Sequence, residues 1–158
     1  MPRLVLLLPL LLLGACGAYR VTPDAARDEA RRINALDTAT LWSIQARTSD
    51  PLELAQVEAE LGSRDQFAAG QAYLGQRTLA QARPGRWRRP SQDDPSLDGV
   101  DCDDFLTDAA AQAEFLGSGG PRNDRHKLDD DGDGLACGWR DDLRRTVAAA
   151  RGGVRVRR

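Results

Sequence analysis

An aspartate-rich loop in the C-terminal third of the chain has the clearest potential for chemistry. Asp129, Asp131 and Asp133 alternate along the sequence and are followed by Gly134 and Leu135. This order matches the start of an EF-hand-type loop, in which positions 1, 3 and 5 supply carboxylates, position 6 is a glycine and position 7 supplies a backbone carbonyl. Hard oxygen ligands in a flexible loop favour Ca²⁺ over Zn²⁺ or Mg²⁺. The sequence therefore predicts a Ca²⁺ site made by the three aspartates and the Leu135 carbonyl.

The end of this loop departs from the EF-hand pattern. The twelfth position, which holds a bidentate Glu in EF-hands, is Arg140 here. Asp141 and Asp142 follow at once, on the first turn of a helix expected to run to Ala150. Either could fold back toward the ion with a water in the last place, and Asp142 is the candidate ligand. A solvated acidic run without metal is the alternative, but four carboxylates within five residues repel one another unless a cation lies among them.

Two cysteines bracket the element that must position this loop. An amphipathic helix is expected from Phe105 to Leu116, with Cys102 just before it and Cys137 just after the loop. In an exported chain an even pair of cysteines indicates a disulfide, which would stabilise a small module by roughly 3 to 4 kcal/mol in the chain-entropy model. The alternative is a metal site completed by His126, but neither cysteine belongs to a CxxC pair. His126 is expected to be structural.

These features together resemble the Excalibur module, the extracellular calcium-binding region of bacterial surface proteins. The resemblance covers about 40 residues, roughly a quarter of the chain. The matching positions are Asp101-Cys102-Asp103-Asp104-Phe105, Ala110-Ala111-Gln112, Phe115, Gly119-Gly120-Pro121, Asp124, His126, Leu128-Asp129 and Asp131 to Cys137. The resemblance implies Ca²⁺ binding by Asp129, Asp131 and Asp133, and pairing of Cys102 with Cys137.

Two positions differ from the family pattern. The family has Glu directly after the second cysteine, where this chain has Gly138, and it tends to have Pro before the histidine, where this chain has Arg125. Neither Gly138 nor Arg140 can donate the two oxygens of a glutamate. We therefore expect an affinity in the roughly 10⁻⁴ to 10⁻³ M range of extracellular Ca²⁺ modules.

The N-terminus has the pattern of an export signal. An arginine precedes an apolar run over residues 4–13, which ends in Leu-Gly-Ala before Cys16. The run is about 15 Å long as a helix, half of the roughly 30 Å bilayer core, so it is too short for a membrane span. The end resembles a bacterial lipobox, which predicts a signal peptide over 1–15, lipidation of Cys16 and a tether over 16–22. Ordinary cleavage after Ala18 is the alternative.

The region from residue 23 to residue 82 is expected to be a helical hairpin or three-helix segment. Apolar spacing predicts helices over 23–47, 52–61 and 64–82. The second has Asp50 as its N-cap and Pro51 at its first position.

The rest of the chain divides by composition. Residues 83–97, rich in Arg and Pro, are interpreted as a linker, with Trp87 as a packing residue. Its arginines could touch anionic lipid or wall polymer, although a solvated linker is favoured. The small calcium-binding module is expected over 98–150, and a basic tail over 151–158 that does not indicate nucleic-acid binding.

Composition limits the class of protein. The net charge of −2 hides a strong segregation: residues 101–142 hold twelve Asp or Glu against four Lys or Arg, and residues 143–158 hold six Arg and no acid. Aromatic residues make up only 5% of the chain, which favours a mainly α fold. The single histidine excludes sites that need several imidazoles.

The expected function is therefore that of a non-enzymatic envelope protein. It would be held at the cell membrane or outer membrane by lipid on Cys16 and bind Ca²⁺ for stability or for contact with wall polymer or an envelope protein. A secreted form is the alternative location. An exported calcium-dependent hydrolase, nuclease-like or accessory to a nuclease, is the alternative function, but residues 19–95 contain no His or Cys and no recognisable pair of acids. A dockerin-like module would repeat the loop.

Overall fold

The chain folds into helices with one short hairpin, so the predicted mainly α class is confirmed. The computed structural model describes residues 23–89 and 99–154. The elements in chain order are α1 (Pro23–Asn34), α2 (Thr38–Arg47), α3 (Pro51–Ser63), β1 (Ala68–Ala69), β2 (Ala72–Tyr73), α4 (Thr78–Gln81), the 3-10 helix η1 (Cys102–Asp104), α5 (Asp108–Gly117) and α6 (Trp139–Val154). Within these ranges, no helix combines the length and apolar character needed to cross a membrane. The predicted signal peptide, Cys16 and tether lie outside the described residues.

The helix predicted over 23–47 is two helices. The first ends at Asn34, and the second begins after Asp37, whose side chain accepts a hydrogen bond from the Thr40 N–H. An N-cap aspartate satisfies backbone donors that have no intrahelical partner, so it favours a new helix start over a continued helix. The sequence pattern predicted one helix because apolar residues recur at helical spacing in both α1 and α2, and this spacing does not show where one helix ends and the next begins.

The helix predicted over 64–82 was wrong. Asp65, Gly70 and Gly75 all have a left-handed backbone, with φ of 57°, 62° and 85°. A continuous helix cannot include these conformations. The segment instead forms the antiparallel pair β1 and β2, with Ala68 opposite Tyr73, followed by the short helix α4. At Gly75 a side chain would also collide with α6, because a Cβ there would lie 2.8 Å from the Cβ of Leu143.

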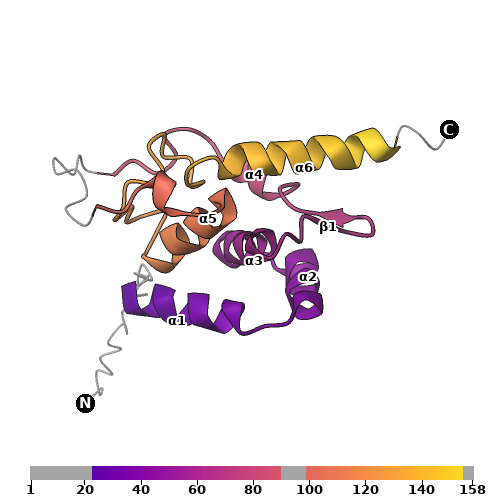
Figure 1. The fold of residues 1–158 in the computed structure, drawn as a ribbon, viewed down its shortest axis with the longest axis horizontal. Coiled ribbons are helices and arrows are strands. Elements are labelled where there is room, and N and C mark those ends of the chain that lie inside the picture. The colour runs from indigo at the N-terminus through magenta and orange to yellow at the C-terminus, as the bar shows by residue number, and fades with distance from the viewer. Residues whose placement is uncertain (1–22, 90–98, 155–158) are drawn as a thin grey trace, which may run out of the picture.

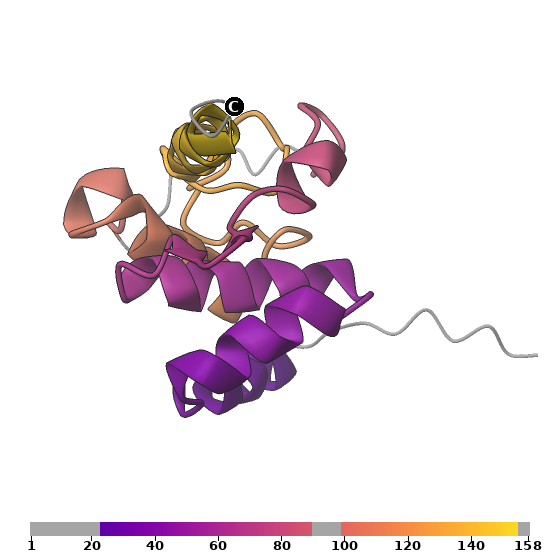
Figure 2. The same cartoon turned by 90° about the vertical axis from the view of Figure 1, so that its right-hand side faces the viewer.

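Helix α3 lies at the centre of the fold. It begins as predicted, with Asp50 accepting from two backbone N–H groups and Pro51 in the first turn. In two perpendicular views α3 runs between α6 on one side and α1 on the other (Figures 1 and 2). Gly62, expected to stop the helix, lies in its last turn and lets Trp139 approach; a Cβ there would come within 2.4 Å of the indole ring.

The apolar core joins the two segments that the sequence analysis separated. One cluster contains buried residues from 23–82 together with residues of the C-terminal module: Ile33, Leu41, Val57, Leu61, Leu74, Ala109, Leu135, Trp139 and Leu143. A second packs Ala59 of α3 against α5 and the loop region, through Phe115, Leu116, Leu128 and Ala136. Burying apolar surface is the main source of stability, so helices α1 to α3 and the region around residues 129–135 stabilise each other.

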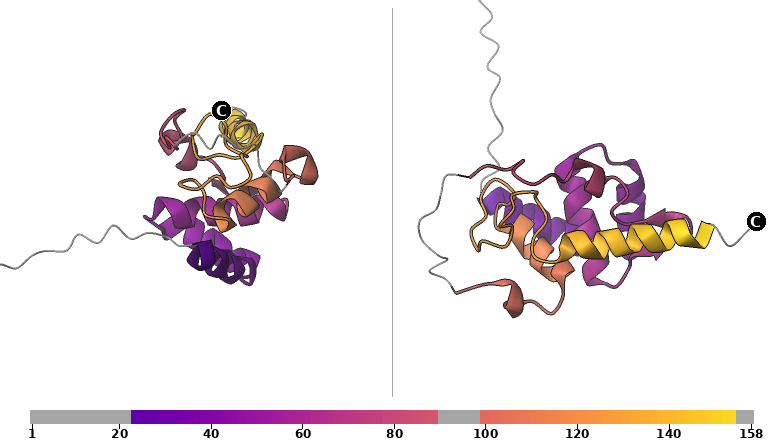
Figure 3. Two further views of the ribbon diagram at one scale, coloured as in Figure 1. Left: turned by 90° about the vertical axis from the view of Figure 1, so that its left-hand side faces the viewer. Right: turned by 90° about the horizontal axis from the view of Figure 1, so that it is seen from above.

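A disulfide links the start of the C-terminal region to the end of the loop. The structure pairs Cys102 with Cys137, 35 positions apart in sequence. Helix α5 begins after Thr107, whose hydroxyl accepts from the Ala110 N–H, so Phe105 lies before this helix and not on it. Seen from above, the loop after α5 lies at the N-terminal end of α6 (Figure 3).

One carboxyl group is buried in the core of this arrangement. Glu58 on α3 is fully buried, and its Oε1 accepts hydrogen bonds from the side chain of Gln45 and the backbone N–H of Gly75. Burial raises the pKa of Glu58 above its ordinary value, and these donors offset only part of the effect. Folding therefore shifts the protonation equilibrium of Glu58 toward the neutral acid.

Replacing Glu58 should change how stability depends on pH. Because the pKa of Glu58 is higher in the folded chain than in the unfolded chain, its stabilising effect is complete below about pH 4.5 and is lost as pH rises toward the folded value. Glu58→Gln should therefore gain stability over the wild type as pH increases from 4 to 8, measured by urea unfolding. Asp28→Asn, which changes an exposed carboxylate on α1, is the control. A constant difference between wild type and Glu58→Gln at all pH values would contradict this prediction.

Candidate metal centre

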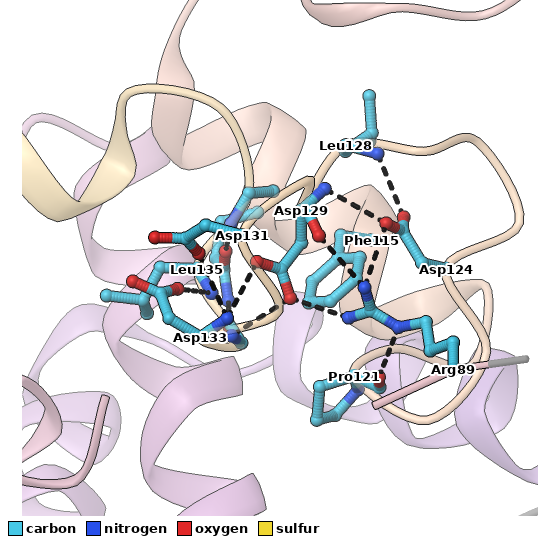
Figure 4. A network of polar contacts seen from close by, with 12 residues as sticks. Arg89, Phe115, Pro121, Asp124, Leu128, Asp129, Asp131, Asp133 and Leu135 are labelled. Carbon is cyan, nitrogen blue, oxygen red and sulfur yellow. Dashed lines mark hydrogen bonds and ion pairs between the residues drawn. The ribbon is translucent and has the colours of Figure 1, made fainter. Parts of the chain in front are cut away.

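Three carboxylates of the acidic loop, residues 129–135, converge on one place. One oxygen each from Asp129, Asp131 and Asp133 lies within 4.8 Å of the others. Asp129 and Asp133 are buried, with 2% and 3% of their surface exposed, whereas Asp131 is exposed. Figure 4 shows the three side chains on one turn of the loop. The group thus combines two buried anions with one side open to solvent.

Hydrogen bonds within the loop hold these carboxylates in place. The Asp133 N–H donates to Asp129 at 3.1 Å and to Asp131 at 3.0 Å, and the Gly134 N–H donates to Asp129 at 2.9 Å. The Leu135 N–H donates to Asp133 at 2.6 Å. Asp and Asn side chains commonly accept from the backbone a few residues on, and here this local preference turns all three carboxylates inward.

Helix α5 holds the exit of the loop through one buried side chain. Gln112 is fully buried; its amide donates to the Gly134 carbonyl at 3.1 Å, and its oxygen accepts from the Ala136 N–H at 2.6 Å. Leu135 lies between them and points its side chain into the core. The sequence signal for this role is a polar residue in the middle of an apolar helix face. Because buried polar groups need hydrogen-bond partners, such a residue is expected to bond to a neighbouring segment.

Residues 83–89 lie along the acidic loop, although they were expected to begin a linker. The Gly85 N–H donates to the Asp131 carbonyl at 2.7 Å, and the Trp87 N–H donates to the Gly132 carbonyl at 2.9 Å. Gly132 has a φ of 66°, and a Cβ on it would lie 3.0 Å from the Trp87 carbonyl oxygen. The loop glycines therefore serve two purposes: they allow left-handed turns and they admit the neighbouring backbone.

Arg89, at the end of this segment, binds the first aspartate of the loop. Its guanidinium donates to the Asp129 carboxylate at 2.6 Å and to the Asp129 carbonyl at 2.9 Å, and it contacts Asp124 at 3.3 Å and the Pro121 carbonyl at 2.9 Å (Figure 4). Burial raises the pKa of Asp129, while the hydrogen bond from Arg89 acts in the opposite direction. Sequence reasoning missed Arg89, because nothing in a run of arginines shows which one folds back.

Asp124 links Arg89 to the start of the loop. It is buried, and its carboxylate accepts from the backbone N–H groups of Leu128 and Asp129 at 2.9 and 3.0 Å. Asp124 is therefore fully engaged in positioning the chain. Asp124 holds the backbone at the start of the loop and is not one of the three carboxylates that converge.

Arg140, at the start of α6, is a second arginine that contacts the group of three. Its guanidinium forms an ion pair with Asp133 and reaches to 3.9 Å from Asp131. The residue at the twelfth loop position thus contributes a cation in place of the glutamate oxygens of an EF-hand. With Arg89 and Arg140 present, two positive side chains face three carboxylates.

Asp142 lies outside this group of three. It forms an ion pair with Arg145 on the next turn of α6. Burial raises the pKa of Asp142, Arg145 lowers it, and the neighbouring carboxylates of Asp108 and Asp141 raise it further. The structure therefore does not bring Asp142 to the loop as the candidate ligand. His126 lies 3.4 Å from Glu114, away from the loop carboxylates.

Gly138 has a structural contact of its own. Its N–H donates to Asp108 at 3.0 Å, and a Cβ added to it would lie 2.4 Å from the same carboxylate. A glutamate at this position would have to displace Asp108 from the first turn of α5. The missing side chain at Gly138 therefore makes room for this contact between α5 and the residue before α6.

The three carboxylates could together hold a metal ion. The donor set consists of carboxylate oxygens, with no thiolate and no imidazole in the group of three. A divalent ion would have to compete with the guanidinium of Arg140 for Asp133. Comparison of the chain with protein-family models, with curated proteins and with solved structures found no match.

Removing the positive charge of Arg89 should destabilise the protein. Arg89→Met retains the apolar stem but leaves Asp129, whose side chain is fully buried, without its cation. Loss of one partner from a buried ion pair costs about 3 kcal/mol or more. Chemical unfolding of metal-free protein should show this loss, and Arg88→Met, which alters the exposed neighbour, should change the unfolding free energy by less than about 0.5 kcal/mol. Equal effects of the two variants would show that the Arg89 network is not formed.

Proposed function

We propose that this chain is an exported, lipid-anchored protein of the cell envelope that binds Ca²⁺ through Asp129, Asp131 and Asp133. The observation that supports the proposal is the convergence of three carboxylate oxygens within 4.8 Å, two of them on buried side chains. Calcium would stabilise the acidic loop, and through it the packing of α5 against α6, or would support contact with another envelope component.

Two buried carboxylates and an exposed third within 4.8 Å of one another would repel strongly without positive charge nearby. Arg89 and Arg140 supply part of that charge. The Asp131 side chain is 53% exposed, so an ion from solvent can reach the group from this side. On entry, Ca²⁺ would replace the Arg140 guanidinium at Asp133 and leave Arg89 on Asp129. Because breaking the ion pair between Arg140 and Asp133 costs free energy, the net free energy of Ca²⁺ binding is smaller. This agrees with the weak affinity expected from the missing glutamate.

Variants of Arg140 and Asp131 give a direct test of the calcium proposal. Arg140→Glu removes the competing cation and places a carboxylate at the twelfth loop position, so it should tighten Ca²⁺ binding by about tenfold or more, whereas Arg140→Gln should tighten it less. Asp131→Asn keeps the oxygen that accepts from the Asp133 N–H but loses the charge, and should weaken binding. Titration calorimetry on mature protein stripped with a chelator measures all four dissociation constants.

Asp130→Asn is the matched control, because Asp130 is exposed, lies between two proposed ligands and is outside the group of three. It should bind Ca²⁺ within about twofold of the wild type, a difference of about 0.4 kcal/mol. Mg²⁺ should compete poorly, since it requires a stricter octahedral geometry. Absence of binding heat and of any thermal stabilisation at roughly 10 mM Ca²⁺, in both wild type and Arg140→Glu, would reject the calcium proposal.

The membrane attachment is proposed from Cys16, which lies outside the described residues. A lipobox cysteine receives two or three acyl chains, and two or more chains give stable anchoring where one does not. Cys16→Ala should move the protein from the membrane fraction to the soluble fraction and abolish labelling by radioactive palmitate. Unlabelled wild-type protein that fractionates identically to Cys16→Ala would contradict the anchor and leave secretion as the location.

A further inference from the structure

An apolar cavity lies beside the acidic loop, between α3, α4 and residues 83–89. Its volume is about 280 Å³, close to the roughly 300 Å³ lower end of small-molecule sites. The apolar side chains that line it come from distant parts of the chain: Leu52, Ala55, Ala82, Leu116, Pro121 and Leu135. Trp87 also lines it and is held in place by the hydrogen bond from its backbone to Gly132.

Two arginines lie against the indole ring of Trp87 at this cavity. The guanidinium of Arg86 lies 5.5 Å from the centroid of the Trp87 ring, and that of Arg122 lies 5.3 Å from it. Both residues line the cavity, both are exposed, and neither forms an ion pair with a carboxylate within residues 23–89 and 99–154. Arg86 donates one hydrogen bond to the Gln81 carbonyl, which leaves most of its donors available.

Among the described residues that line the cavity, Asp133 is the acid, and it does not cancel the positive charge of Arg86 and Arg122. Asp133 is 3% exposed, and its carboxylate is paired with Arg140 and accepts from the Leu135 N–H. Within residues 23–89 and 99–154, the cavity therefore combines apolar walls with two arginines, Arg86 and Arg122, that form no ion pair with a carboxylate. A neutral apolar ligand would make no use of the arginines, and a cationic ligand would be repelled by them.

We propose that this cavity binds a single-chain anionic amphiphile, such as a fatty carboxylate, taken up from outside the chain. The apolar tail would lie against Leu52 and Leu116, and the anionic head group would accept hydrogen bonds from Arg86 and Arg122 at the wall of the cavity. Guanidinium groups match carboxylate geometry with paired hydrogen bonds, and those bonds are stronger than neutral ones. Burial of the tail supplies the affinity, and the arginines supply the preference for an anion.

The two proposed sites share Asp133 and Leu135, but the amphiphile proposal does not rest on calcium binding, so its test uses calcium-free protein. The experiment titrates mature protein with dodecanoate in the presence of a chelator, below the micelle concentration, and follows binding by calorimetry and tryptophan fluorescence. Dodecyltrimethylammonium has the same tail with a cationic head group and is the ligand control. We expect dodecanoate to bind at least about tenfold more tightly than the cation.

Two kinds of variant locate the site. Arg86→Gln/Arg122→Gln changes two exposed side chains and should weaken dodecanoate binding at least about tenfold without changing the unfolding midpoint. Arg27→Gln, an exposed arginine on α1, should bind as the wild type does. Ala55→Leu fills part of the cavity and should weaken both amphiphiles, and Trp87→Phe should remove most of the fluorescence change.

The proposal fails if dodecanoate does not bind. It also fails if the cationic amphiphile binds equally well, or if the double arginine variant binds dodecanoate like the wild type, because either result would assign the binding to apolar contact alone. A fluorescence change that persists in Trp87→Phe would place the ligand elsewhere. None of these results depends on whether the acidic loop binds Ca²⁺.

Discussion

The structure depends on how the crowded negative charge of the acidic loop is balanced. Three carboxylates approach one another, and Asp129 and Asp133 are almost completely buried. Buried charge is tolerated only when it is paired and hydrogen-bonded. Backbone N–H groups of the loop supply some of the bonds, and two arginines supply positive charge, Arg89 at Asp129 and Arg140 at Asp133. Each arginine belongs to a different segment, so the balance of charge also holds those segments together.

This charge balance helps to explain why residues 83–89 and the C-terminal region pack together, although composition predicted a linker between two separate parts. Residues 83–89 run along the loop because Arg89 reaches Asp129 and because Gly132 leaves room for the backbone of Trp87. Helix α5 holds the other side through Gln112, and the disulfide fixes the loop exit. Helix α3 then packs on α5 and α6, so one apolar core includes residues from both halves of the chain.

The same contacts place the two proposed sites next to each other. Trp87 contacts the acidic loop through its backbone and lines the apolar cavity with its ring. Leu135 has its N–H bonded to Asp133 and its side chain between the core and the cavity. An anion site and a cation site can be neighbours here because Arg140 and Arg89 compensate the loop carboxylates, while Arg86 and Arg122 have no carboxylate partner within the described ranges.

Local patterns were sufficient for several features of the fold. The N-cap Asp50 with Pro51 placed the start of α3, and the alternation of Asp129, Asp131 and Asp133 before Gly134 placed the convergent carboxylates. These features depend on neighbours within a few residues, where turn and capping preferences act directly. The predicted helix over 64–82 was wrong because one of its residues has a backbone conformation that apolar spacing does not reveal. Its apolar spacing was compatible with a helix, but Gly75 adopts a left-handed backbone that also gives Leu143 room to pack.

The sequence by itself determined the helical class, the cysteine pair and the three carboxylates of the acidic loop. Tertiary structure alone decided which cations meet them. Arg89 lies 40 positions from Asp129, and one arginine among several in its segment folds back onto that carboxylate. Arg140 contacts Asp133, whereas Asp142 on the same helix pairs with Arg145. The rotation of α6, set by the burial of Trp139 and Leu143 against α3 and Gly75, makes that choice, and long-range packing of this kind leaves no periodic trace in the sequence.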